Sequence, residues 1–185
     1  DGLWGIEYNS GNANLLSGLV IEYLQTTNQS GPIHWNPNDA YWTQLTEVQA
    51  TGADDYYNNG CYNGWAHYGM SAGTPLLKSP VYNKDGYLRF TDNRVKALHI
   101  GINGYFTTQW NYRILASYRK SWGTPFIPVS TPKNATSALL EITYTPQKWE
   151  GWSFCGAFSI DRGSLYGNNT AAAISVRKTG FIFNR

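Results

Sequence analysis

Apolar residues alternate with small or polar residues over several segments between residue 96 and the C-terminus. The clearest segment is residues 151–162, in which four apolar side chains alternate with small and polar ones. The apolar set is Trp152, Phe154, Phe158 and Ile160, and the intervening set is Ser153, Cys155, Ala157, Ser159 and Asp161. Successive side chains of a β-strand point to opposite faces of the sheet. The pattern therefore predicts strands with one apolar and one polar face.

Alternation and turn residues together predict seven strands along the chain. They span residues 2–9, 16–26, 95–105, 109–120, 136–146, 151–162 and 170–183. Short connections are expected at 10–14, 107–108 and 147–150, and longer ones at 27–94, 121–135 and 163–169. Bacterial outer-membrane barrels keep short turns on the periplasmic side and long loops outside the cell. The order of connections therefore favours this class of all-β protein.

The second face of the strands also indicates a membrane barrel. It carries Arg, Glu, Asp, Asn and Ser mixed with Gly and Ala, which suits a wet or hydrogen-bonded lumen, whereas the aromatic face suits lipid. A tilted membrane strand needs roughly 9 to 11 residues, and the predicted strands are about that long. The charges expected to face inward are Glu7, Glu22, Arg113, Arg119, Glu141, Asp161 and Arg177. We therefore predict an antiparallel transmembrane outer-membrane β-barrel located in the cell outer membrane.

Seven strands do not close a bacterial single-chain barrel, which takes an even number, and an open sheet edge in lipid leaves backbone groups unsatisfied. We therefore expect residues 1–185 to be one domain that forms the C-terminal part of a larger barrel. Its partners would be outer-membrane lipid and the remainder of the barrel, N-terminal to this chain. Within this domain, residues 27–94 would be a long extracellular loop.

Composition agrees with a membrane protein but does not decide the class alone, because a Tyr-rich secreted β protein has a similar composition. Charged residues make up 14% of the chain, against about 25% in an ordinary soluble domain. Aromatic residues reach 16%, with 14 Tyr and 8 Trp, the residues that gather at membrane interfaces. No run of 18 apolar residues occurs, which excludes a helical membrane span. The net charge of +2, without a basic run, excludes nucleic acid as a partner.

Residues 27–94 are too many for a structureless connection, which predicts a folded or functional loop. Aromatic rings in this segment are interleaved with carboxylates and amides. Rings stack on the apolar face of a sugar, and the polar groups bond its hydroxyls. Packing of the loop alone would also use such rings. The candidate polysaccharide-binding residues are Asp54, Asp55, Tyr56, Tyr57, Asn58, Asn59, Tyr62, Asn63, Trp65 and Tyr68.

Several ordered blocks of sequence carry a resemblance to a known family. They are an IEY strand, the stretch TTNQSGPIH, the block DDYYNNGCYNGWAHYGMSAGTPLL and the strand entry NRVKALHIGINGY. Together they resemble the capsule assembly proteins of the Wzi family, in a Bacteroidetes-like form. The resemblance implies an outer-membrane barrel that binds and retains capsular or other surface polysaccharide as a lectin and not as an enzyme. The family's N-terminal helical region has no counterpart here, and the site residues above rest on chemistry alone.

Catalytic and metal chemistry find little support in the sequence. Residues 69–73 match G-x-S-x-G, but a nucleophile elbow needs a preceding strand and a following helix, and Thr74-Pro75 follows instead. The three histidines lack zinc-ligand spacing. We therefore expect no enzyme activity, no metal site and no cofactor.

Two other functions stay open. The inward charges would either pair across strands or line a pore, and the second case describes an outer-membrane channel for small solutes. A soluble secreted carbohydrate-binding β-sandwich is the other alternative. It predicts a chain that stays monomeric without detergent.

Overall fold

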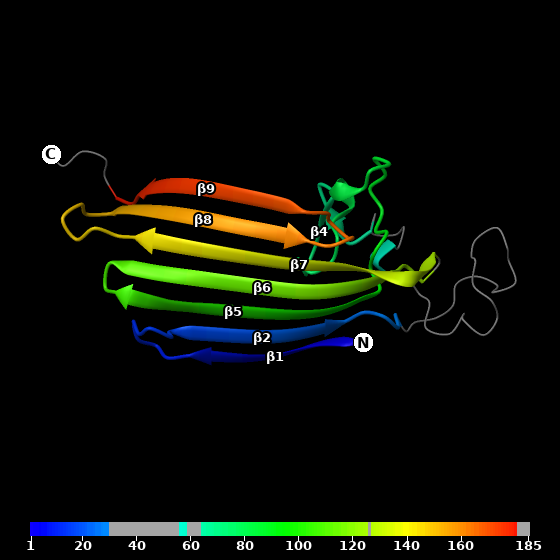
Figure 1. Ribbon diagram of the computed structural model, residues 1–185, viewed down its shortest axis with the longest axis horizontal. Helices are drawn as coiled ribbons and strands as arrows, with labels where there is room; N and C mark the ends of the chain where they lie inside the picture. Colours follow the sequence, from blue (N-terminus) through cyan, green and yellow to red (C-terminus); the bar gives the residue numbers. More distant parts are fainter. Residues whose placement is uncertain (30–55, 59–63, 126, 181–185) are drawn as a thin grey trace, which may run out of the picture. The chain divides into compact units, whose positions relative to one another are not determined.

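The computed structural model describes residues 1–29, 56–58, 64–125 and 127–180. Its main element is an antiparallel seven-stranded open sheet, so the prediction of an all-β protein is confirmed. The strands are β1 (Gly2–Asn9), β2 (Gly18–Gln25), β5 (Val95–Thr107), β6 (Trp110–Gly123), β7 (Pro128–Tyr144), β8 (Trp152–Arg162) and β9 (Asn169–Lys178). Their order in the sheet, β1-β2-β5-β6-β7-β8-β9, follows the chain (Figure 1).

The register of the last three strands confirms the predicted alternation. Leu140 of β7 pairs with Phe158 of β8, which pairs with Ala172 of β9. One position along the strand, Glu141 pairs with Ala157, which lies opposite Ala173. Because paired residues point to the same side of a sheet, Leu140 and Phe158 share one face, the apolar face, and Glu141, Ala157 and Ala173 share the other, the polar face.

One predicted connection is wrong. Residues 121–135 were expected to form a long connection, but β6 continues to Gly123 and β7 begins at Pro128. Gly123 has a φ of +75°, and proline lacks the N–H that a strand ladder uses, so both residues are typical of loops. The strands extend here because their side chains make long-range contacts, described below for Ser121 and Lys133.

The chain divides into two compact units. Unit 1 comprises Asp1–Trp4, Tyr23–Ala97 and Arg119–Asn134, and unit 2 comprises Gly5–Glu22, Leu98–Tyr118 and Ala135–Arg185.

In unit 2, the connection between β1 and β2 packs directly on β5. Ser17 donates its backbone N–H to the carbonyl of Asn103 (2.9 Å), and Tyr105 donates to Asn14 (2.8 Å). A Cβ added at Gly104 would lie 1.8 Å from the carbonyl oxygen of Leu15. Only glycine permits this approach. The turn is therefore fixed on the sheet by backbone contact.

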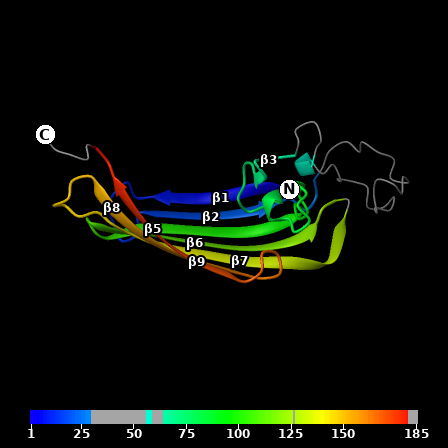
Figure 2. The same ribbon diagram turned by 90° about the horizontal axis from the view of Figure 1, so that it is seen from above.

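Unit 1 contains a small folded segment, residues 64–94, which we call the cap. It holds the hairpin of β3 (Ala66–His67) and β4 (Met70–Ser71) and the 3₁₀ turn η4 (Pro80–Tyr82) (Figure 2, which labels β3). A second 3₁₀ turn, η2 (Tyr56–Asn58), packs against the cap.

The core of unit 1 joins the cap to the ends of β2 and β5. It consists of Leu24, Tyr57, Leu76, Leu77, Phe90, Val95 and Ala97. Val95 and Ala97 are buried, whereas Lys96 and Leu98 between and after them are exposed. The buried pair therefore lies on the side of β5 that also carries His99. Within unit 1, the cap thus packs on the side of β5 that carries Val95 and Ala97.

Candidate functional site

The structure places only part of the predicted binding set. Asp54, Asp55, Asn59, Tyr62 and Asn63 lie outside the described residues, and Tyr56 is described through its backbone in η2 alone. Four predicted residues remain, and they fall into two groups. Tyr57 and Asn58 face the core of unit 1, whereas Trp65 and Tyr68 face solvent.

Tyr57 and Asn58 hold η2 against the cap. The Tyr57 ring is buried, with its centroid 5.6 Å from that of Phe90. The Asn58 amide donates to the carbonyl of Phe90 (3.0 Å) and accepts from the backbone N–H of the same residue (2.7 Å). The side-chain amide of Asn58 thus satisfies both backbone hydrogen-bonding groups of Phe90, as a neighbouring strand would. Both residues therefore contribute to the packing of η2 on the cap.

Trp65 and Tyr68 are displayed by the β3–β4 hairpin. Trp65 is 47% exposed and Tyr68 is 89% exposed. The turn residues Tyr68 and Gly69 both have positive φ, 48° and 75°, as the tightest hairpin turns require. The left-handed backbone at Tyr68 is unusual for a bulky residue, and it aims the ring into solvent, with its edge packed on His67 (4.5 Å between centroids). The hairpin therefore presents two aromatic rings, Trp65 and Tyr68, to solvent.

The exposed aromatic surface continues onto a neighbouring part of the cap that the sequence analysis did not assign. The backbone N–H of Val81 donates to the carbonyl of Gly69 (2.8 Å). A Cβ added at Gly69 would meet the side chains of Leu88 (3.0 Å) and Val81 (3.1 Å). Next to these residues in the chain, Tyr82 is 58% exposed and Tyr87 is 65% exposed. The sequence feature that could have indicated this part of the surface is the turn Asn83-Lys84-Asp85-Gly86, which has a tyrosine on each side.

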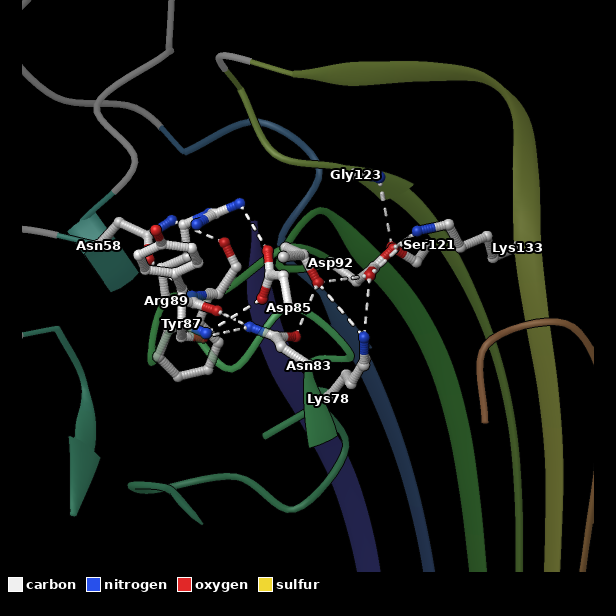
Figure 3. Close-up of polar contacts among 12 residues, drawn as sticks. Asn58, Lys78, Asn83, Asp85, Tyr87, Arg89, Asp92, Ser121, Gly123 and Lys133 are labelled. Carbon is white, nitrogen blue, oxygen red and sulfur yellow. Dashed lines mark hydrogen bonds and ion pairs between the residues drawn. The ribbon is translucent and has the colours of Figure 1, made fainter. Parts of the chain in front are cut away.

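A buried carboxylate fastens the cap to the strands of unit 1. Asp92 is fully buried, and Figure 3 shows Lys78, Ser121 and Lys133 converging on it. Lys133 Nζ lies 2.9 Å from Asp92 Oδ1, and Lys78 Nζ lies 3.9 Å from Oδ2. The hydroxyl of Ser121 donates to Oδ1 (3.1 Å) and that of Thr91 to Oδ2 (2.8 Å). A buried charge is tolerated only when paired and hydrogen-bonded, and Asp92 meets both conditions.

Two arginines add further ties within unit 1. Arg119 of β6 donates to the carbonyls of Pro75 (3.3 Å) and Leu76 (3.2 Å). Arg94 donates its Nε–H to the carbonyl of Thr27 (3.0 Å), and burial lowers the pKa of this guanidinium. Arg119 was predicted to face inward, and in the structure its guanidinium binds the backbone of the cap. The cap is thus held by several strands and not by its two ends alone.

In unit 2, the polar face forms a cavity of about 620 Å³. Glu7, Asn103 and Arg113 are among its lining residues. Arg113 is bonded to Glu141 on the neighbouring strand β7, which fits the expectation that inward charges pair across strands. The cavity is lined by both polar and apolar side chains.

Ser71, the serine of the G-x-S-x-G match, lies in strand β4. Its hydroxyl donates to the carbonyl of Thr74 (3.1 Å). Among the histidines, His99 has its Nδ1 2.8 Å from the hydroxyl of Ser117. No group of three or more His, Cys, Asp or Glu side chains suited to a metal ion occurs in this part of the chain. Nor does any described helix have the length and apolar character to cross a membrane.

Comparison with family models, curated proteins and solved structures gave no match to this chain.

Proposed function

We propose that this chain is part of an outer-membrane β-barrel protein that binds and retains capsular polysaccharide at the cell surface without catalysis. The observation that carries the proposal is the aromatic surface of the cap, where Trp65 and Tyr68 stand exposed on a fixed hairpin. Exposed rings on a rigid support suit the apolar faces of sugars, and they cost little conformational entropy on binding.

The location in the outer membrane is supported by the apolar face of unit 2. In β9, Ile174 is 88% exposed and Val176 is 56% exposed, and Phe158 in β8 is 50% exposed. Contiguous apolar side chains of this kind are unfavourable in water and favourable in lipid. β8 and β9 have 11 and 10 residues, which matches the roughly 9 to 11 that a tilted membrane strand needs.

The two edges of the sheet, β1 and β9, support the existence of further strands. An unpaired strand edge within lipid leaves backbone N–H and C=O groups without partners, each at a cost of several kcal/mol. We therefore infer that the remainder of the barrel, N-terminal to this chain, pairs with these edges. Outer-membrane lipid would then cover the apolar face.

The position of the cap favours polysaccharide binding over an open channel. Within unit 1 the cap packs through Leu76, Leu77 and Phe90 on the side of β5 that carries Val95 and Ala97, and in a barrel this side of β5 would face the lumen. A soluble sandwich is also less favoured, because it needs a second sheet against the apolar face. In the described residues the second sheet is the two-stranded β3–β4 hairpin, which is too small for this role.

The test uses the full-length native protein in detergent and purified capsular polysaccharide from the producing strain. We expect immobilised polysaccharide to retain the wild-type protein and to lose most of the Trp65→Ala variant. Trp149→Ala is the matched control, because Trp149 is 58% exposed but lies in the connection between β7 and β8, outside the cap. Failure of the wild type to bind, or equal loss in both variants, would reject the proposal.

A further inference from the structure

The turn formed by residues 83–89 of the cap is held rigid by its own side chains (Figure 3). The two N–H groups of the Asn83 amide donate to the carbonyls of Tyr87 (2.8 Å) and Arg89 (2.6 Å). The carboxylate of Asp85 accepts from the backbone N–H of Tyr87 (3.1 Å) and from the guanidinium of Arg89 (2.9 Å). Both amide protons and both carboxylate oxygens are thus used to fix one conformation.

The buried Asp92 cluster extends to this turn. The hydroxyl of Thr91 donates to Asp92 (2.8 Å) and also lies 3.3 Å from the amide oxygen of Asn83. Thr91 therefore connects a fully buried carboxylate to the side chain that shapes the exposed turn. Preorganisation of this kind reduces the conformational entropy that a binding surface loses when its ligand arrives.

Tyr87 is the most prominent ring of the turn. It is 65% exposed, and the guanidinium carbon of Arg89 lies 5.2 Å from its ring centroid. The paired Asp85 and Arg89 side chains are themselves about half exposed, with 42% and 51% of their surfaces accessible. A ring for the apolar face of a sugar therefore stands beside one acceptor and one donor group for its hydroxyls.

The turn and the β3–β4 hairpin belong to one surface. Leu88, next to Tyr87, closes around Gly69, which is next to Tyr68 in the hairpin turn. A Cβ added at Gly69 would lie 3.0 Å from Leu88 Cδ2, so the hairpin turn and the turn at 83–89 lie next to each other. Two aromatic platforms on one surface suit a ligand that is longer than one sugar.

We propose that the turn at 83–89 is a second carbohydrate platform, centred on Tyr87, and that the cap binds a chain of several sugar units across both platforms. This inference rests on the proposed function and specifies its ligand as an oligosaccharide or polymer. The first platform, at Trp65 and Tyr68, holds one part of the chain. Once one part of the sugar chain is bound there, the rest of the same chain is held near the second platform at a high effective concentration. The affinity for long chains therefore exceeds that for short ones.

The experiment measures binding of a length series of oligosaccharides, cut from the purified capsular polysaccharide, to the full-length protein in detergent by calorimetry. For the wild type we expect affinity to rise with chain length and then level off. Tyr87→Ala should weaken binding of the long oligosaccharides about fivefold, the size expected for one aromatic contact, and leave the shortest binding fragments unaffected. Tyr87→Phe, which keeps the ring, should behave as the wild type.

Asn83→Ala tests the positioning of the turn. It keeps Tyr87 but removes the two hydrogen bonds that hold the carbonyls of Tyr87 and Arg89. We expect it to reduce the gain with chain length as Tyr87→Ala does, with the thermal midpoint of unfolding measured alongside to separate this effect from global destabilisation.

The outcomes separate this inference from the proposed function. A wild type that binds neither the polymer nor any fragment rejects the proposed function itself. A wild type that binds, with a length dependence unchanged in Tyr87→Ala, rejects the second platform alone. Loss of the shortest fragments in Tyr87→Ala also overturns the inference, because a single site would then contain Tyr87.

Discussion

Lys133 Nζ lies 2.9 Å from Oδ1 of the fully buried Asp92, which joins strand β7 to the end of the cap. Asp92 also accepts hydrogen bonds from the hydroxyl of Ser121 in β6 and from that of Thr91 in the cap. Three chain segments that are distant in sequence therefore meet at one carboxylate. The attachment of the cap depends strongly on this group because Asp92 is a fully buried charge that β6, β7 and the cap share.

Replacement of Asp92 by alanine should loosen the cap. The change leaves Lys78, whose side chain is 14% exposed, without its buried counter-charge. Loss of one partner from a buried ion pair costs about 3 kcal/mol or more. We expect hydrogen exchange of the cap amides at residues 64–94, measured by mass spectrometry, to become about 100-fold faster.

Asp85→Ala is the matched control for this prediction. It removes the same type of side chain from an ion pair with Arg89 in which both partners are about half exposed. Exposed pairs contribute about 0 to 1 kcal/mol. Its effect should therefore stay within the turn, and equal protection of the cap in Asp92→Ala and Asp85→Ala would contradict the role assigned to Asp92.

A pair of glycine substitutions tests the packing of the β1–β2 connection. At Gly104 an added Cβ would lie 1.8 Å from the carbonyl oxygen of Leu15, whereas at Gly156 in β8 nothing lies within 4 Å. Overpacking of a close contact typically costs about 1–3 kcal/mol. Gly104→Ala should lower the free energy of unfolding in urea by this amount. Gly156→Ala should leave it nearly unchanged, and similar midpoints for the two variants would be the contrary result.

The sequence was sufficient to place the strands because each strand carries its own signal. In residues 152–161 apolar side chains recur at every second position except Gly156, and the register of β8 with β7 and β9 puts them on a separate face from the intervening residues. The two-residue alternation can be recognised within one strand, without information about the strands beside it. The ends of β6 and β7 were missed because Gly123 and the prolines nearby have loop propensities, and distant contacts at Ser121 and Lys133 outweigh them.

The candidate site was harder to predict for the same physical reason. Composition distinguishes aromatic from polar residues but does not tell which rings fill the core. Tyr57 and Tyr68 belong to the same block of sequence, yet Tyr57 is 8% exposed and Tyr68 is 89% exposed. Their difference arises from the contact of Tyr57 with Phe90, 33 positions along the chain. Local sequence contains no information on a contact of that range.

The membrane assignment predicts a difference between the two faces of β8. Phe158 lies between Leu140 and Ala172 on the apolar face, and the next residue, Ser159, lies between Leu139 and Ala171 on the polar face. An arginine on the lipid face of a barrel costs about 2–4 kcal/mol near the bilayer midplane. Phe158→Arg should therefore reduce the yield of folded protein in lipid vesicles strongly, and Ser159→Arg should not. Equal yields would argue against lipid contact of the apolar face.

The channel alternative makes an electrical prediction that differs from ours. If the cap stays packed on the polar side of its strands, the full-length protein in a planar bilayer should give little steady single-channel current, and Asp92→Ala should raise this current by loosening the cap.

An open channel should instead conduct ions in the wild-type protein. Its conductance should change when Arg113, which lines the cavity of unit 2, becomes alanine. Because the ion pair of Arg113 with Glu141 is distant in sequence from the cap, Arg113→Ala should leave polysaccharide retention intact. Steady wild-type current that responds to Arg113→Ala, together with absent polysaccharide binding, would favour the channel.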